Sequence, residues 1–313
     1  MSYTIIRPKS HDAWLSERNK GIGSSEVATI LGINPYDTPL QLWRRKKGLE
    51  PAKEMNEAML MGHLLEDAVA KRWQIETGLE VIGRSAGDWL MVDTDRPFLR
   101  VSPDRTYWLR DLKHNHDNKG ILEIKTTQFD VDADHLPQYW FCQLQYQLGV
   151  AGYTEGWLAW LKFGRDFGTR HFDFNPEFYL WMRGELEKFW RDNIIGGKEP
   201  EAISVDDVLT KYPQPQDGKT IEATDQILDA YTRLKDIKTE IDRLTSTKDE
   251  LESSIKIAIG DAEALMSRGT TIATWKATKA TEKFDATLFK AEQPDLYTQY
   301  LRQQPGARRF VIK

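Results

Sequence analysis

The stretch GILEIKTTQ, residues 120–128, decides the fold of this chain. Its short apolar run is typical of a buried strand, yet it contains Glu123 and Lys125. Residues i and i+2 of a strand share one face, so these two charges point together, while Leu122 and Ile124 point to the opposite face. A cross-strand ion pair at a sheet edge would explain the pattern. A buried pair would instead need further charged partners, because desolvating both groups is costly.

Two other acidic residues could supply those partners. Asp104, in VSPDR, ends a predicted strand upstream, and Glu66, in MGHLLEDAVA, lies on the apolar side of a predicted helix. That helix is expected to pack four apolar residues inward: Leu64, Leu65, Val69 and Ala70. Three converging carboxylates repel one another unless a cation lies among them. Oxygen ligands from Glu66, Asp104, Glu123 and the backbone carbonyl of Ile124 suit Mg²⁺, or Mn²⁺ in its place.

Lys125 gains a chemical role if a metal ion is bound. A lysine beside a bound water and a scissile phosphate can orient that water or help to deprotonate it, and can offset developing negative charge. The sequence therefore predicts phosphodiester hydrolysis.

Composition limits the class of protein. The chain has 313 residues, 40% of them apolar, which is enough for a large core. Its single cysteine, Cys142, cannot form an intrachain disulfide, and a structural zinc site is not expected. The apolar runs are too short to cross a membrane and the start lacks a secretory signal, so we expect a cytoplasmic protein. A net charge of −5 does not exclude a local basic groove for nucleic acid.

The order of patterns predicts an α/β core with a central mixed sheet flanked by helices. Residues 11–79 have helical periodicity, with Ser24 or Ser25 as a helix cap and a longer helix at 57–77. Residues 80–127 have strand periodicity and suggest a meander, with HNHDNKG as one of its turns. A densely apolar helix follows Pro137, and then two strands and a helix at about 176–195.

A polar, turn-rich segment divides the chain. We expect one domain over 1–205, a linker over 206–222 and a C-terminal extension over 223–313. From Thr224 to about Ser267 the spacing predicts a helix with a narrow apolar seam, which Lys238 and Lys248 interrupt. An antiparallel helical hairpin, or a seam laid on another subunit, therefore competes with a free two-stranded coil. The last 45 residues, including ARRFVIK, are expected to form short strands around a helix.

The acid, P-D and E-x-K pattern resembles that of the PD-(D/E)XK nuclease superfamily. Five segments occur in the order and approximate spacing of the phage lambda exonuclease group and its YqaJ-type viral recombinase branch: DAWLSERNKGIGSSEVATILG, MGHLLEDAVA, VSPDR, GILEIKTT and FCQLQYQLGVAG. The resemblance covers roughly residues 11–195. It implies a PD-(D/E)XK nuclease core.

The resemblance also implies residue roles. Glu66, Asp104, Glu123 and the carbonyl of Ile124 would hold one or two Mg²⁺ ions, and Lys125 would serve the attacking water. Gln143, the first glutamine of QLQYQ, would support this site from the following helix. Read without the resemblance, Gln143, Gln145 and Gln147 are hydrogen-bonding residues of a buried helix.

Basic residues and one tryptophan are candidates for DNA contact. Arg18 and Ser25 have the spacing of the family pair that holds a terminal 5′-phosphate; alternatively, Ser25 caps a helix and Arg18 is solvated. Arg105 stands where the family usually has the glycine of SPDG, so the turn geometry differs or an extra cation lies near phosphate. Trp43, Arg44 and Arg45 begin the WRRKK cluster, which is either a solvated helix end or a DNA contact.

The resemblance implies a metal-dependent 5′-to-3′ exonuclease on double-stranded DNA that leaves 3′ single strands for phage recombination. It further implies a homo-oligomeric ring, a trimer or tetramer, a single-strand annealing protein as partner, and a phage or prophage gene expressed in the cytoplasm of a bacterial host. The rivals are an endonuclease on the same fold and an inactive DNA-binding recombination mediator. The C-terminal extension could oligomerise, dock the annealing protein or grip DNA, and we favour oligomerisation.

Overall fold

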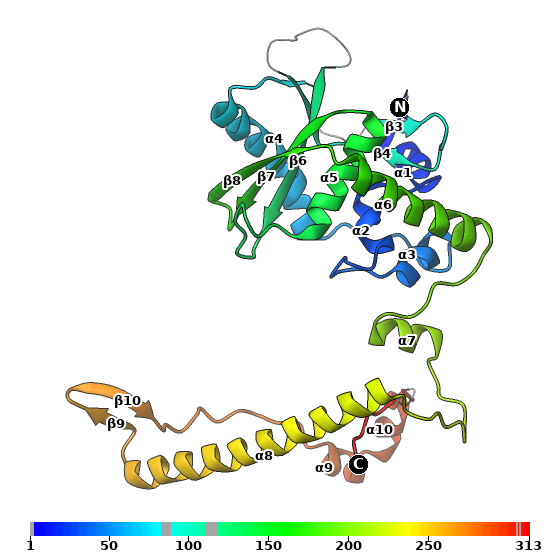
Figure 1. Ribbon diagram of the computed structural model, residues 1–313. Helices are drawn as coiled ribbons and strands as arrows, with labels where there is room; N and C mark the ends of the chain where they lie inside the picture. Colours follow the sequence, from blue (N-terminus) through cyan, green and yellow to red (C-terminus); the bar gives the residue numbers. More distant parts are fainter. Residues whose placement is uncertain (1–2, 83–88, 110–117, 305, 307) are drawn as a thin grey trace. The chain divides into compact units, whose positions relative to one another are not determined.

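The stretch that opens the sequence analysis lies in β6 (Lys119–Thr127), the central strand of a five-stranded sheet (Figure 1). The sheet order is β2 (Val81–Ile82), β5 (Arg105–Trp108), β6, β7 (Glu155–Lys162) and β8 (Asp166–Asp173). β6 and β7 are parallel, whereas the other neighbouring strands are antiparallel. The sheet is therefore mixed, as predicted.

The segment between β2 and β5 belongs to a different sheet. β3 (Leu90–Asp93) pairs with β1 (Tyr3–Ile6) and with β4 (Arg100–Val101) in a separate three-stranded sheet. The prediction of one meander over residues 80–127 is therefore wrong, because the chain leaves the large sheet after β2 and returns to it at β5. Most of the predicted turn HNHDNKG lies outside the described residues.

Helices cover both faces of the large sheet (Figure 1). On one face, α4 (Glu57–Thr77) buries Val69 and Trp73 against Leu122 and Ile124 of β6. On the other face lie α5 (Gln138–Ala151) and, beyond it, α6 (Pro176–Lys188), and Ile121 belongs to their core. The strand alternation of β6 thus divides its side chains between two cores.

The helix at 57–77 has the predicted bounds but not all of the predicted packing. Asn56 caps its start, and Gly78, with a φ of 69°, ends it in the left-handed conformation. Val69 and Ala70 are buried as expected, whereas Leu64 is 65% exposed. Leu65 is half-buried, so the fully buried face of α4 begins at Glu66, two residues after Leu64.

Four short helical segments precede α4. They are α1 (His11–Asn19), η1 (Ser24–Glu26), α2 (Val27–Ile30) and α3 (Pro39–Lys46). The predicted cap at Ser24 or Ser25 is displaced to Gly23, whose backbone N–H donates to the Glu26 carboxylate at 2.9 Å. This bond closes the turn that follows α1.

The structure is a computed structural model that describes residues 3–82, 89–109, 118–304, 306 and 308–313. The chain divides into two compact units, one ending at Tyr212 and the other starting at Pro213. This division falls inside the predicted linker. Residues 205–211, however, form α7, whose Asp207 accepts a hydrogen bond from the Thr38 hydroxyl at 2.7 Å, so this part of the predicted linker belongs to the first unit. Between α6 and α7, the helical segment η3 (Phe189–Ile195) continues α6.

The second unit is built on α8 (Asp225–Ile259). The helix ends before the predicted Ser267, because Gly260 takes a positive φ and residues 264–267 form β9. β9 pairs with β10 (Thr270–Thr274), and α9 (Ala286–Glu292) and α10 (Pro294–Tyr300) follow. The described residues of ARRFVIK form no strand, contrary to prediction. None of the described helices is long and apolar enough to span a bilayer.

Candidate active site

The candidate site lies where the large sheet opens beside β6. The ladder between β5 and β6 ends at the pair Arg105 and Leu122, while β6 continues to Thr127 along β7. Asp104 directly precedes β5, and its Oδ2 accepts the backbone N–H of Ile124 at 2.7 Å. The N–H and C=O of one strand residue point toward the same strand edge, so the Ile124 carbonyl faces this opening as well.

Glu123 and Lys125 share one face of β6, as predicted, and contact each other there. Lys125 Nζ donates to Glu123 Oε1 at 2.6 Å and to Gln143 Oε1 at 2.8 Å. Gln143 Nε2 in turn donates to Glu123 Oε1 at 2.6 Å. The structure therefore brings the predicted glutamine from α5 to the predicted acid and lysine in a closed ring of three hydrogen bonds.

Gln147 is a further residue of this cluster, which the sequence analysis expected to form hydrogen bonds in a buried helix but did not assign to the candidate site. Its side chain is fully buried, and its Nε2 donates to Glu123 Oε2 at 2.8 Å and to Ser24 Oγ at 3.2 Å. Gln143 and Gln147 are four residues apart and so share one face of α5. That spacing was the available signal. Among the described residues, Gln147 Oε1 has no hydrogen-bond partner.

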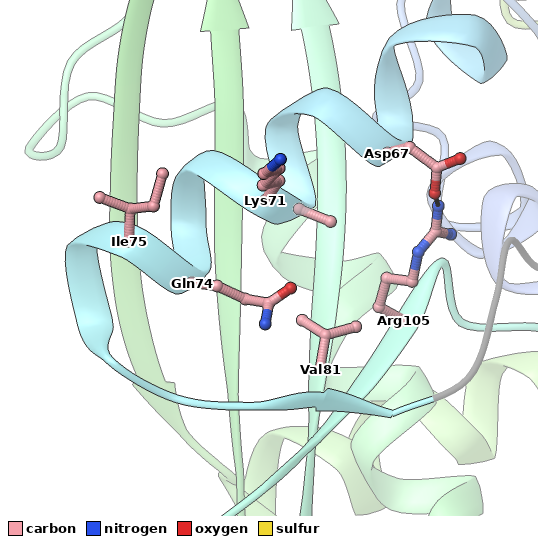
Figure 2. A pocket seen from close by; sticks show the side chains of 7 residues that line it. Asp67, Lys71, Gln74, Ile75, Val81 and Arg105 are labelled. Carbon is pink, nitrogen blue, oxygen red and sulfur yellow. Dashed lines mark hydrogen bonds and ion pairs between the residues drawn. The ribbon is translucent and has the colours of Figure 1, made fainter.

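Glu66 reaches the opening from α4, on the opposite face of the sheet, and is held by two basic side chains. Its Oε1 lies 2.9 Å from His63 Nδ1, and Arg105 Nη1 donates to its Oε2 at 3.2 Å. Arg105 Nη2 also donates to Asp67 Oδ1 at 2.7 Å, and Figure 2 shows this ion pair. Asp104 lies at the gap in the sheet beside β6. Side chains from both faces of the sheet therefore come close to its carboxylate.

Arg105 is not placed to contact DNA. Its side chain is 2% exposed, and its guanidinium donates to Glu66, to Asp67 and to the carbonyl oxygen of Asp104. The expectation of a DNA contact at this position is therefore wrong.

Arg105 instead forms one wall of a pocket of about 560 Å³ between α4 and the β2–β5 edge (Figure 2). Seven residues line this pocket: Asp67, Ala70, Lys71, Gln74, Ile75, Val81 and Arg105.

The buried charges shift one another's ionisation. Burial, and then the nearby carboxylates of Glu123 and Glu66, raise the pKa of Asp104 well above its usual value. Burial by itself would lower the pKa of Lys125, but Glu123 and Asp104 outweigh it and the pKa of the lysine is raised. The lysine is therefore held as an ammonium ion among carboxylates that repel one another.

The candidate site offers the oxygen ligands that a hard divalent cation prefers. The repulsion that raises the pKa of Asp104 is the interaction that a cation among Glu66, Asp104 and Glu123 would relieve, and all of these groups offer oxygen. Among the residues that the structure describes, no group of three or more acidic, histidine or cysteine side chains is arranged to hold a metal ion as it stands, so the carboxylates would have to move together around one. His63, Arg105 and Lys125 occupy carboxylate oxygens that a metal ion would share.

Arg18 and Ser25 also come together, as their spacing suggests. Arg18 Nη2 donates to Ser25 Oγ at 2.5 Å, and its guanidinium lies over the Trp14 ring, 5.3 Å from the centroid. The neighbouring Ser24 is bonded to Gln147. The segment η1, which carries Ser25, is thus joined through one glutamine side chain to Glu123.

The WRRKK cluster does not present a free basic surface. Trp43 is buried and donates its Nε1–H to the carbonyl of Asn193 at 2.9 Å, so it is a core residue and not a base-stacking one. Arg44 pairs with Glu50 at 2.5 Å, and Arg45 pairs with Asp37. The expectation of base stacking by Trp43 is contradicted by its burial, whereas DNA contacts at Arg44 and Arg45, whose side chains are partly exposed, stay a prediction.

Comparisons with known proteins place the chain in a family. The family model for the YqaJ-like viral recombinase domain matches residues 13–154. The uncharacterised protein YqaJ of Bacillus subtilis (strain 168) is 32% identical over 316 residues, covering 97% of this chain and 94% of that protein.

Two solved structures are more distant. An alkaline exonuclease from Laribacter hongkongensis has a TM-score of 0.48 and 18% identity, covering 59% of this chain and 93% of that chain. A phage related exonuclease from Haemophilus somnus 129PT has a TM-score of 0.39 and 12% identity, covering 57% and 96%. Likeness at this level carries no conclusion about activity. The sequence matches do establish kinship, and the chain belongs to the family of the YqaJ-like viral recombinase domain.

Proposed function

We propose that this protein is a metal-dependent exonuclease that digests double-stranded DNA from 5′ ends and leaves 3′ single strands for phage recombination. The observation that carries the proposal is the convergence of Asp104, Glu123 and Lys125, with Glu66 approaching from the other face of the sheet. The family description, a viral recombinase domain, agrees with DNA as substrate. A single-strand annealing protein is the partner that would use such 3′ strands.

Glu66, Asp104, Glu123 and the carbonyl of Ile124 would hold Mg²⁺, or Mn²⁺, as one or two ions. When bound, such an ion stabilises negative charge on phosphate oxygens and lowers the pKa of a coordinated water. The protein's own groups set the geometry: Gln143 and Gln147 fix both oxygens of Glu123, and Asp104 is fixed by the Ile124 N–H. Fixed donors need no reorganisation as the reaction proceeds, which lowers the barrier.

Lys125 would act on the attacking water and the scissile phosphate. Its ammonium is held in place by Glu123 and Gln143, so it can orient a water and offset charge that develops as the water attacks phosphorus. The bond from phosphorus to the leaving 3′-oxygen breaks, and that oxygen takes up a proton. The new end of the shortened strand then carries a 5′-phosphate.

Arg18 and Ser25 would bind that terminal 5′-phosphate. Arginine offers a permanent charge and two parallel donors, and the serine adds a hydroxyl. They already contact each other at 2.5 Å. Gln147 connects this turn to Glu123, so the distance between the bound end and the cut bond would be set by a buried side chain.

One gel experiment tests the proposal. Linear duplexes labelled at the 5′ or 3′ end, with and without a 5′-phosphate, are incubated with Mg²⁺ or EDTA beside closed circular DNA. We expect loss of the 5′ label as mononucleotides, faster with the phosphate, no digestion in EDTA and intact circles. Nicked circles would indicate an endonuclease. Binding without any digestion would indicate an inactive recombination mediator.

A further inference from the structure

The helix α8 has an uncovered apolar face. Of its 35 residues, Asp225–Ile259, all except Ile259 are exposed, including seven large apolar residues at 38–61% exposure. These seven are Ile227, Leu234, Ile237, Ile241, Leu244, Leu251 and Ile255. A helix of this length, about 50 Å, does not gain its stability from an exposed apolar stripe. An exposed apolar face of this length is expected to pack against another protein surface.

The stripe follows a strict seven-residue repeat. Its first positions, termed a, are Ile227, Leu234, Ile241, Lys248 and Ile255. Its second positions, termed d, are Ala230, Ile237, Leu244, Leu251 and Ala258. Such a repeat is the signature of helices that pair along a seam. Lys238, which the spacing first suggested as an interruption, flanks the seam, so among the ten positions only Lys248 is charged.

We propose that this seam pairs with the same seam of a second copy of the chain, with the two helices antiparallel. The order of side chains is self-complementary when one helix is reversed. In that register, Ile241 faces Leu244 of the other copy, Leu234 faces Leu251, and Lys248 faces Ile237. At both ends a large residue meets a small one, because Ile227 faces Ala258 and Ile255 faces Ala230.

A parallel pair fits the same sequence poorly. It would place Lys248 against the second copy's Lys248 in the seam, where two like charges repel. It would also set Arg233 beside Lys238 across the interface, and like charges there oppose pairing. Its end layers would hold alanine against alanine, which fills the seam poorly. The antiparallel register avoids all three conflicts.

The chain's own following segments leave the seam open. The backbone oxygen of Lys313 accepts a hydrogen bond from the Tyr231 hydroxyl at 2.7 Å, but Tyr231 flanks the seam and does not lie on it. Lys248 pairs with Glu252 of its own helix at 3.2 Å, which lets its aliphatic stem lie along the seam while its charge stays in water.

Antiparallel pairing of identical helices has a consequence for assembly. Each copy uses the same surface, so the contact has twofold symmetry and the particle contains an even number of chains. A ring with an odd number of chains would satisfy its seams only by pairing with a second ring. This inference does not depend on the nuclease chemistry.

Sedimentation of the full-length protein tests the pairing. Wild type should contain an even number of chains, and Leu244→Glu, which puts a carboxylate in the centre of the seam, should halve the particle mass. Thr239→Glu is the matched control, because Thr239 lies on the outer side of the same helix, and it should keep the wild-type mass. Circular dichroism checks that α8 stays helical. An odd-numbered wild-type particle, or a Leu244→Glu protein of unchanged mass, would overturn the proposal.

Disulfide trapping tests the direction. Chains with Leu234→Cys and chains with Leu251→Cys, one of them carrying a tag that changes its mass, are mixed, and oxidised under native conditions. Cys142 is buried and stays in place. The antiparallel register predicts disulfides between the two kinds of chain. Disulfides only between chains of the same kind would show a parallel pair.

Discussion

At the scale of single residues, the two charges in GILEIKTTQ are held by side chains from two sides of the sheet. Glu123 and Lys125 contact Gln143 from α5, and Asp104 and Glu66 approach at the gap beside β5. None of these groups is an isolated buried charge. This is the arrangement in which a buried acid and lysine are tolerated in a core strand.

Lys125→Ala should lower the rate of DNA hydrolysis by about 10²–10⁴-fold, the range for losing a positioned group that acts on a proton or a developing charge. Glu123 would keep its bonds to Gln143 and Gln147, so the fold should persist. The measurements are single-turnover digestion of labelled duplex and fluorescence anisotropy for DNA affinity.

Lys119→Ala is the control for this variant. Lys119 begins the same strand, but its ammonium lies over the Trp108 ring, 5.1 Å from the centroid, and away from the carboxylates. It should keep wild-type activity. Equal loss of activity in both variants, or full activity in Lys125→Ala, would remove the assigned role of Lys125.

Arg105 makes a second prediction, about stability. Arg105→Met should destabilise the first unit by about 3–5 kcal/mol, because the buried carboxylate of Glu66 would lose its guanidinium partner. Asp67→Ala removes the other acid that Arg105 contacts, but Asp67 has an 88% exposed side chain, so its loss should cost less than about 1 kcal/mol. Urea unfolding of both variants measures the difference. Similar costs for the two variants would show that the Arg105–Glu66 pair is not the stabilising one.

At the scale of elements, α5 is the scaffold of the site, since it carries Gln143 and Gln147 and packs between the sheet and α6. Gly149 is the point of closest approach. A Cβ atom there would lie 2.2 Å from Cε2 of Tyr179, a fully buried ring on α6. The glycine therefore sets how closely the two helices approach.

Gly149→Ala should cost about 1–3 kcal/mol of stability, because the added methyl group overpacks a filled core. It should also reduce digestion, since α5 positions both glutamines. Gly184→Ala on α6 is the matched control: no atom lies within 4 Å of its added Cβ, and it should raise stability by up to about 1 kcal/mol. Thermal unfolding measures the stability of both variants, and the digestion assay measures their activity. A Gly149→Ala protein as stable and active as wild type would contradict this packing account.

The elements also show what sequence patterns can predict. The bounds of α4 were predictable because Asn56 and Gly78 cap it chemically, and β6 was predictable from its short apolar run. The division of residues 80–127 between two sheets was not, because strand periodicity does not specify a partner strand. For the same reason Trp43 and Arg105 were assigned to the surface, although Asn193 and Glu66, far away in sequence, bury them.

At the scale of the whole molecule, the chain separates into a unit that carries the candidate site and a unit built on an exposed seam. The candidate site could be predicted almost residue by residue, because its acids, lysine and Gln143 occur in ordered motifs. Gln147 could not be assigned in that way. Its role follows from its bonds to Glu123 and Ser24, which only the three-dimensional structure reveals.

The central claim is that carboxylates from both faces of the sheet bind hard divalent cations beside Lys125. The most direct measurement is a Mn²⁺ titration followed by electron paramagnetic resonance, without DNA, on wild type, Asp104→Asn and Asp67→Asn. Asp104 is central to the cluster, whereas Asp67 lies on the same helix as Glu66 but in solvent. We predict Mn²⁺ binding to wild type and Asp67→Asn, and its loss in Asp104→Asn. Unchanged binding in Asp104→Asn would contradict the account.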